Sequence, residues 1–124
     1  MDNENQEVKS LFTKLCVQLK QSFPRYRRNL NATSEPGVYI IRKEENILYV
    51  GRTLRGSGGI HQRLKDHLYG SSSFTKKYLQ GNGAMLREDG YTYQYFKLRD
   101  PRKRALLEAY ATGVLCPQHI GLGE

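Results

Sequence analysis

The chain has 124 residues, which leaves room for one domain, or for one domain with an extra helix. Hydrophobic residues make up 38% of it, enough for a modest core and too many for a disordered tail. Twenty Lys and Arg against twelve Asp and Glu give a formal net charge of +8, and nine tyrosines are interleaved with the basic residues. This combination favours a nucleic-acid partner over a membrane surface, with a merely soluble basic protein as the alternative.

Two isolated cysteines, Cys16 and Cys116, lie far apart in apolar, helix-like patterns. They form neither a disulfide framework nor a zinc motif, so we expect both to be buried core residues of a protein in a reducing compartment. The acidic start, Met1 to Glu4, does not resemble a signal peptide, and no apolar run approaches membrane-spanning length. These features predict a cytoplasmic protein with no membrane partner.

Residues 1–35 are predicted to form a helix and a basic connector. Apolar residues three and four apart between Glu4 and Phe23 predict an amphipathic helix that Pro24 stops. A basic cluster, residues 25–28 with the sequence Arg-Tyr-Arg-Arg, follows, and residues 29–36 have the composition of a loop. We expect this segment to be an addition to a domain over residues 36–124.

Two short apolar strands, Gly37–Arg42 and Asn46–Gly51, are predicted to form a hairpin around a three-residue loop, residues 43–45. In that register Tyr39 lies directly opposite Tyr49, and both phenols share one face. The other face would carry Val38, Ile40, Leu48 and Val50. Two adjacent phenols on a basic surface suit contact with phosphate, although both could be ordinary half-buried strand residues.

The rest of the chain predicts helices and one further strand. The loop Thr53–Gly59 lacks the Gly-Lys-Ser/Thr ending of a nucleotide P-loop. The fold class expected is α+β, with a small three-stranded antiparallel sheet flanked by helices and an added N-terminal helix. The remaining predicted elements are a helix over 60–69 that buries Ile60, Leu64 and Leu68, a short helix after Ser71–Ser73, a strand over 91–98 and a helix over 102–115 begun by Asp100 and Pro101.

Arg63 and His67 stand four apart on the first of these helices and therefore share a face beside its apolar stripe. A basic pair facing a two-tyrosine hairpin is suited to grip a phosphate, although a lone Arg-x-x-x-His is more often a solvated face. On the last helix, Glu108 lies at the border of the apolar face, where a partly desolvated carboxylate needs a cation. Mg²⁺ fits this need, and a salt bridge to Arg104 or another arginine fits it equally.

In this order the residues resemble the signature of the GIY-YIG nucleases. Gly37-Val38-Tyr39 is similar to the first half of the signature and Tyr49-Val50-Gly51 to the second, while Arg63 and Glu108 fall where the family keeps its helix arginine and its metal-binding glutamate. The spacing of His67 after Arg63 resembles that of restriction-enzyme members. The resemblance covers roughly residues 36–120.

The resemblance implies a divalent-metal-dependent DNA endonuclease that hydrolyses phosphodiester bonds. Glu108 would bind Mg²⁺ or Mn²⁺, Tyr39 would act as general base, directly or with His67, and Tyr49 would position the water or the phosphate. Arg63 would neutralise the phosphate. The predicted phosphate and DNA contacts are Arg52, Arg55, Lys76 and Lys77.

One position departs from the family pattern, because Ile120 occupies the slot of an asparagine usually found about twelve residues after the glutamate. Gln118 or His119 could substitute for it. A catalytically inactive nucleic-acid-binding module of the same fold is therefore the alternative, and an adaptor using the N-terminal helix is a third reading. A homodimer or a targeting partner protein is compatible with the sequence.

Overall fold

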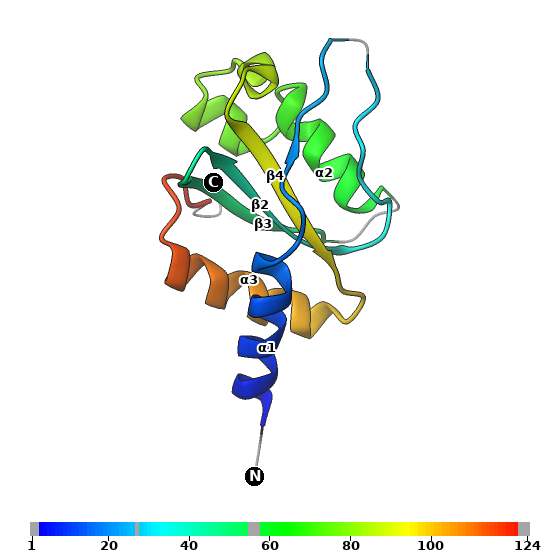
Figure 1. Ribbon diagram of the computed structural model, residues 1–124, viewed down its shortest axis with the longest axis vertical. Helices are drawn as coiled ribbons and strands as arrows, with labels where there is room; N and C mark the ends of the chain where they lie inside the picture. The colour runs from blue at the N-terminus through cyan, green and yellow to red at the C-terminus, as the bar shows by residue number, and fades with distance from the viewer. Residues whose placement is uncertain (1–2, 27, 55–57, 122–124) are drawn as a thin grey trace.

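The computed structural model describes residues 3–26, 28–54 and 58–121. The chain forms four strands, three α-helices and two short helical turns within these ranges (Figure 1). In chain order they are α1 (Glu4–Cys16), β1 (Gln21–Ser22), β2 (Gly37–Lys43), β3 (Asn46–Arg52), α2 (Gly59–Leu68), the π-helical turn η1 (Phe74–Tyr78), the 3₁₀ turn η2 (Gly83–Arg87), β4 (Tyr91–Lys97) and α3 (Pro101–Leu115).

The strands form one antiparallel sheet in the order β1-β4-β2-β3. The α+β class with flanking helices and an added N-terminal helix is therefore confirmed. The sheet has a fourth strand, because Gln21 and Ser22 pair with Tyr93 and Thr92. The sequence had placed these two residues in the first helix.

That helix ends at Cys16 and not at Phe23, which corrects the sequence prediction. The side-chain amide of Gln94 on β4 donates hydrogen bonds to the carbonyls of Leu15, Cys16 and Gln18, where the helical ladder stops. Phe23 leaves the helical path and packs against Tyr93, with ring centroids 4.9 Å apart. A tertiary contact therefore overrides the local periodicity.

The sheet separates two apolar layers. One face packs against α2 and the turns after it, through a cluster that includes Tyr39, Ile41 and the predicted helix stripe Ile60, Leu64 and Leu68. The other face packs against α1 and α3, which cross beneath the sheet in Figure 1. This second cluster consists of Leu11, Leu15, Val38, Ile40, Val50, Leu107 and Ala111.

The last helix begins as predicted, with the Asp100 carboxylate accepting a hydrogen bond from the Lys103 amide and Pro101 in its first turn. It ends at Cys116, whose φ of 49° is left-handed. Cys116 is exposed and Cys16 is half-buried, so the prediction of two buried thiols is wrong. Both cysteines lie at helix ends, past the buried turns. Val114, in the last turn of the same helix, is exposed as well.

No helix among the described residues is long and apolar enough to cross a membrane.

Candidate active site

The hairpin register brings Tyr39 and Tyr49 to one face by a different route from the predicted one. The loop has two residues, 44 and 45, with Lys43 paired to Asn46. In an uninterrupted ladder this register would place Tyr39 opposite Val50 and the two phenols on opposite faces. A bulge at Leu48 shifts the pairing by one residue, so Tyr39 lies opposite Gly51 and Tyr49 opposite Ile41.

The two tyrosines are therefore diagonal neighbours and not direct partners, with ring centroids 6.2 Å apart. The same bulge turns Leu48 to the α2 side of the sheet, where it joins the cluster of Tyr39 and Ile41. The prediction that Leu48 lies with Val38, Ile40 and Val50 is wrong for this reason.

Gly51 is required by the ring that lies over it. A Cβ at this position would lie 2.5 Å from Cζ and Oη of Tyr39 and 2.8 Å from Cε2 of Tyr49. Such distances are far inside van der Waals contact, so any side chain would displace a phenol. Gly51, the next-to-last residue of β3, therefore makes room for the Tyr39 hydroxyl.

The Tyr39 hydroxyl lies 2.7 Å from Nε2 of His67, and both residues are fully buried. On the other side of the imidazole, Nδ1 lies 2.6 Å from Oγ of Ser72. Thr75 closes the network: its amide donates to Ser72 Oγ, its hydroxyl accepts from Ser72, and it donates to the carbonyl of His67. The sequence indicated neither Ser72 nor Thr75 as a site residue, because their role depends on the buried position of His67.

This network determines where the imidazole proton lies. A carbonyl only accepts, so the Thr75 proton points to the carbonyl of His67, and the Ser72 proton points to Thr75. The short contact between Nδ1 and Ser72 then requires the proton on Nδ1. Nε2 is left with its lone pair, which accepts the hydrogen bond from Tyr39.

Burial, with smaller contributions from Arg63 and His119, lowers the pKa of His67 from 6.5 to about 3, so the ring is neutral at physiological pH. Burial also raises the pKa of Tyr39, and Tyr49 acts in the same direction, whereas Arg63 opposes the shift. Desolvation thus outweighs the effect of the nearby Arg63, which favours the phenolate.

Tyr49 is the solvent-facing phenol of the pair. Desolvation and Glu108 raise its pKa, whereas Arg63 acts to lower it. The ring of Tyr49 stacks on Phe74, with centroids 5.1 Å apart. It lines a hollow of about 260 Å³ together with Glu108, His119 and Ile120.

Glu108 projects from α3 at the border of this hollow, and its carboxylate is partly buried, as predicted. Burial raises its pKa, and Arg52 counteracts the shift. Nε of Arg52 donates to Oε1 of Glu108 at 3.0 Å. The alternative partner proposed from the sequence, Arg104, instead donates to the carbonyls of Thr53, Leu98 and Arg99.

Arg63 lies half-buried between α2 and the two phenols, and it acts to lower both phenol pKa values. One of its terminal nitrogens donates to Asp66 at 3.2 Å. Its Nε is buried without a hydrogen-bond partner among the described residues. The guanidinium is thus held on one side by a carboxylate and has donor capacity to spare.

The segment after α3 joins the site through the edge strand. The amides of Gln118 and His119 donate to the carbonyls of Ile47 and Leu48 on β3. This pairing places the His119 ring 5.8 Å from both Tyr49 and Phe74, and Ile120 beside it on the hollow. A histidine, and not an asparagine, therefore contacts the solvent-facing tyrosine from this segment.

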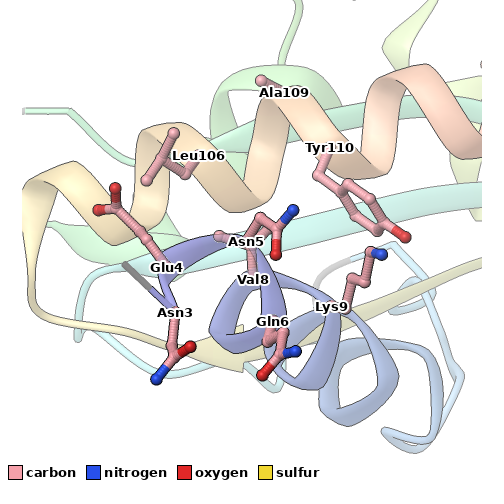
Figure 2. A pocket seen from close by; sticks show the side chains of 9 residues that line it. All are labelled: Asn3, Glu4, Asn5, Gln6, Val8, Lys9, Leu106, Ala109 and Tyr110. Atoms are coloured by element: carbon pink, nitrogen blue, oxygen red, sulfur yellow. The ribbon is translucent and has the colours of Figure 1, made fainter. Parts of the chain in front are cut away.

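The predicted DNA contacts that the structure describes lie in two places. Arg52 adjoins Glu108 in the site, whereas Lys76 and Lys77 are exposed on η1, the turn that also carries Phe74. Arg55 falls outside the described residues. A second hollow of about 990 Å³, shown in Figure 2, lies between α1 and α3 and is lined by side chains such as Asn5, Lys9 and Tyr110. None of the predicted site residues lines it.

A metal ion at this site would depend on Glu108. No group of three His, Cys, Asp or Glu side chains in the described ranges is arranged to hold a metal. One partly buried carboxylate beside an open hollow suits a hard cation that takes its other ligands from water and phosphate oxygens. The residues present therefore fit a single Mg²⁺ or Mn²⁺, with Arg52 sharing the carboxylate.

The fold is that of a nuclease-type domain. The family model of the GIY-YIG catalytic domain matches residues 35–114, and the chain belongs to this family. No curated protein and no solved structure matches the chain.

Proposed function

We propose that this protein is a divalent-metal-dependent DNA endonuclease that hydrolyses phosphodiester bonds with Tyr39, Tyr49, Arg63, His67 and Glu108. The observation that supports it best is the buried hydrogen bond from Tyr39 to an imidazole whose free lone pair faces it. Membership of the GIY-YIG family supports the reaction class.

The base in this proposal is the Tyr39–His67 pair. As a water molecule attacks the phosphorus, the Tyr39 oxygen takes one of its protons, and the Tyr39 proton passes to Nε2 of His67. The imidazolium that forms keeps the proton on Nδ1 and continues to donate it in the hydrogen bond to Oγ of Ser72. The water oxygen bonds to phosphorus as the bond to the 3′ oxygen breaks. The 3′ oxygen leaves with the electron pair of that bond and takes a proton from solvent. The raised pKa of Tyr39 is then no obstacle, because the phenol does not have to ionise first. It accepts a proton from water while it gives its own proton to His67.

Substrate must first reach the buried hydroxyl. Tyr39 is fully buried, and Arg63 lies beside it with a donor to spare. A phosphate in the hollow would draw the guanidinium outward, because charge-assisted hydrogen bonds to phosphate are stronger than those to a neutral phenol. We propose that this movement opens Tyr39 and neutralises the phosphate at the same time. Tyr49, already on the hollow, would position the attacking water.

Glu108 would hold the cation against the phosphate. A bound Mg²⁺ or Mn²⁺ supplies positive charge for the phosphate and for the leaving oxygen. Arg52 holds one carboxylate oxygen, and a carboxylate has further lone pairs for a cation. Arg52, Lys76, Lys77 and Arg55 would contact the DNA backbone around this point.

The test is nicking of a supercoiled plasmid by the pure protein, with and without Mg²⁺. We expect Mg²⁺-dependent conversion to nicked circles, and loss of this activity in Glu108→Gln. Arg104→Lys is the matched control on the same helix, since the hydrogen bonds of Arg104 within the described residues go to carbonyls and not to Glu108. Plasmid cleavage by Glu108→Gln at the wild-type rate would exclude the metal assignment. No cleavage by the wild type on any DNA form would favour the inactive binding module.

A second variant separates the base from the metal. Tyr39→Phe removes one hydroxyl, and we expect it to stop turnover while Mn²⁺ and DNA still bind. Because Nε2 of His67 would lose its hydrogen-bond partner, the variant should also be less stable by about 1–3 kcal/mol. The measurement is therefore made well below its unfolding temperature. Wild-type turnover in this variant would show that Tyr39 is not the base.

A further inference from the structure

A second candidate binding surface lies where the basic connector meets the end of α2, and none of its residues lines the hollow beside Glu108. Arg87, at the end of η2, donates a hydrogen bond of 2.7 Å to the carbonyl of Pro24. Its guanidinium lies 5.9 Å from the ring centroid of Tyr26 and 5.8 Å from that of Tyr69. Three segments distant in sequence thus meet around one fixed arginine.

Both rings are largely open to solvent, with Tyr26 74% and Tyr69 68% exposed. A contact whose only role is to tie the connector to α2 would gain by burying these rings, because buried aromatic area is a large part of what an aromatic contributes to stability. Two exposed, oriented rings with a guanidinium between them form instead a platform on which flat groups can stack.

The charge around the platform is strongly positive on the connector side. Residues 17–34, which follow α1, contain four Lys and Arg and no Asp or Glu. This stretch lies outside the matched family region, which begins at residue 35. Beside the platform, Arg25 and Arg28 line a hollow of about 540 Å³ that also includes Pro24. The exposed Glu88 and Asp89 directly follow Arg87 in the chain and repel a polyanion, which favours its contact with the basic connector.

We propose that this surface, consisting of Tyr26, Tyr69, Arg87, Arg25 and Arg28, binds an unpaired DNA segment. Its bases stack on the two tyrosines and its phosphates contact the arginines of the connector. A closed duplex keeps its bases inside, so it would use the arginines but not the rings. The inference rests on DNA being the substrate of the proposed function. It adds a preference for DNA that carries a single-stranded stretch.

The test measures binding in EDTA, where cleavage is absent, to a fluorescent single-stranded oligonucleotide and to the same sequence as a blunt duplex. We expect Tyr26→Ala and Tyr69→Ala each to weaken single-strand binding about tenfold, and duplex binding less than twofold. Tyr26→Phe and Tyr69→Phe keep the ring and should bind as the wild type does. Leu19→Ala is the matched control, because it shortens a 75% exposed side chain in the same stretch without touching a ring.

A second readout reports stacking directly. An oligonucleotide containing 2-aminopurine should lose fluorescence on binding to the wild type, and less so with the alanine variants. The proposal is overturned if both alanine variants bind the single strand like the wild type, including the case in which they only lower the melting temperature. It is also overturned if Leu19→Ala weakens binding as much.

The result is separable from that of the nuclease proposal. Ring-dependent single-strand binding by a protein that nicks no DNA would uphold this surface and refute the endonuclease. Mg²⁺-dependent nicking by a protein whose single-strand binding does not depend on the two rings would support the endonuclease and refute this surface.

Discussion

The His67 imidazole is enclosed by Tyr39, Ser72 and aromatic rings, and this environment favours its neutral form in the resting protein. Its pKa is 6.5 in the unfolded chain and about 3 in the fold. Protonation therefore favours the unfolded chain. The stability that depends on a neutral His67 is fully present above pH 6.5 and is lost as the pH falls towards 3.

The corresponding prediction concerns the difference between the wild type and His67→Gln. Each pH unit in this window costs the wild type about 1.4 kcal/mol of unfolding free energy, so about 2 kcal/mol is lost between pH 6.5 and pH 5. Gln carries no titrating proton and lacks this loss. Urea unfolding of both proteins at several pH values measures the difference. A difference that stays constant from pH 7 to pH 5 would contradict a buried neutral His67.

Gly51 gives a second prediction at the scale of one residue. Gly51→Ala places a methyl group 2.5 Å from the Tyr39 ring, so a phenol must shift at a cost of about 1–3 kcal/mol. We expect a lower melting temperature and, if Tyr39 is the base, loss of nicking. Gly113→Ala is the matched control: it lies within α3 with no atom close to the added methyl, and it should raise stability by about 0.5–1 kcal/mol. Equal effects of the two substitutions would contradict the close approach.

At the scale of elements, features that depend on residues close in sequence were predicted well, whereas features that depend on tertiary contacts were predicted poorly. The stripe Ile60, Leu64 and Leu68 and the Asp100 cap follow from residues near one another in sequence, and both are confirmed. The early end of α1 depends on Gln94, which is nearly eighty residues away. No local pattern carries that information.

In the hairpin, two errors in the predicted register leave the facing of the tyrosines unchanged. The predicted three-residue loop and the missing bulge each shift the register by one residue, and a total shift of two residues keeps Tyr39 and Tyr49 on the same face. Leu48 reveals the difference, because it is the residue that the bulge turns over. A bulge has no reliable sequence signal when its extra residue is apolar like its neighbours. The Ser72–Thr75 network was missed because it forms only around a histidine that is already buried.

The packing of α1 leads to a prediction about the N-terminal segment. Leu15 is fully buried in the cluster that includes Val38 and Ile40. These two residues belong to β2, the strand that carries Tyr39, and they lie on its face towards α1 and α3. Leu15→Ala should therefore destabilise the whole fold by about 2–5 kcal/mol. Val17→Ala, at a position 74% exposed just after the helix, should change stability by less than about 0.5 kcal/mol. Chemical unfolding followed by tyrosine fluorescence measures both.

A biphasic transition in the Leu15→Ala protein, with the sheet unfolding at the wild-type midpoint, would show that α1 unfolds separately from the domain. A single transition at a lower midpoint would show that the added helix and the sheet share one core. A single transition would argue against a division at residue 35, which treats the N-terminal helix as an addition to a separate domain.

For the whole molecule, the position of the positive charge matters more than its total. Two salt bridges join α1 and α3, because Arg102 pairs with Glu4 and Lys103 with Glu7. The connector residues Arg25 and Arg28 are exposed in a stretch that has no acidic residue. A DNA backbone should therefore displace counterions at the connector and leave the paired charges of α1 and α3 undisturbed.

This argument predicts different salt dependences for two variants with the same net charge. Replacing Arg25 and Arg28 by Ala should reduce the slope of log affinity against log salt concentration by about 2, since each phosphate contact contributes about 0.9. Replacing Arg102 and Lys103 by Ala also removes two positive charges, and it should leave the slope nearly unchanged because those charges already face carboxylates. Anisotropy titrations with one labelled duplex over a series of salt concentrations give both slopes. If the two slopes fell equally, total charge alone would govern binding, and the connector would have no special place in holding DNA.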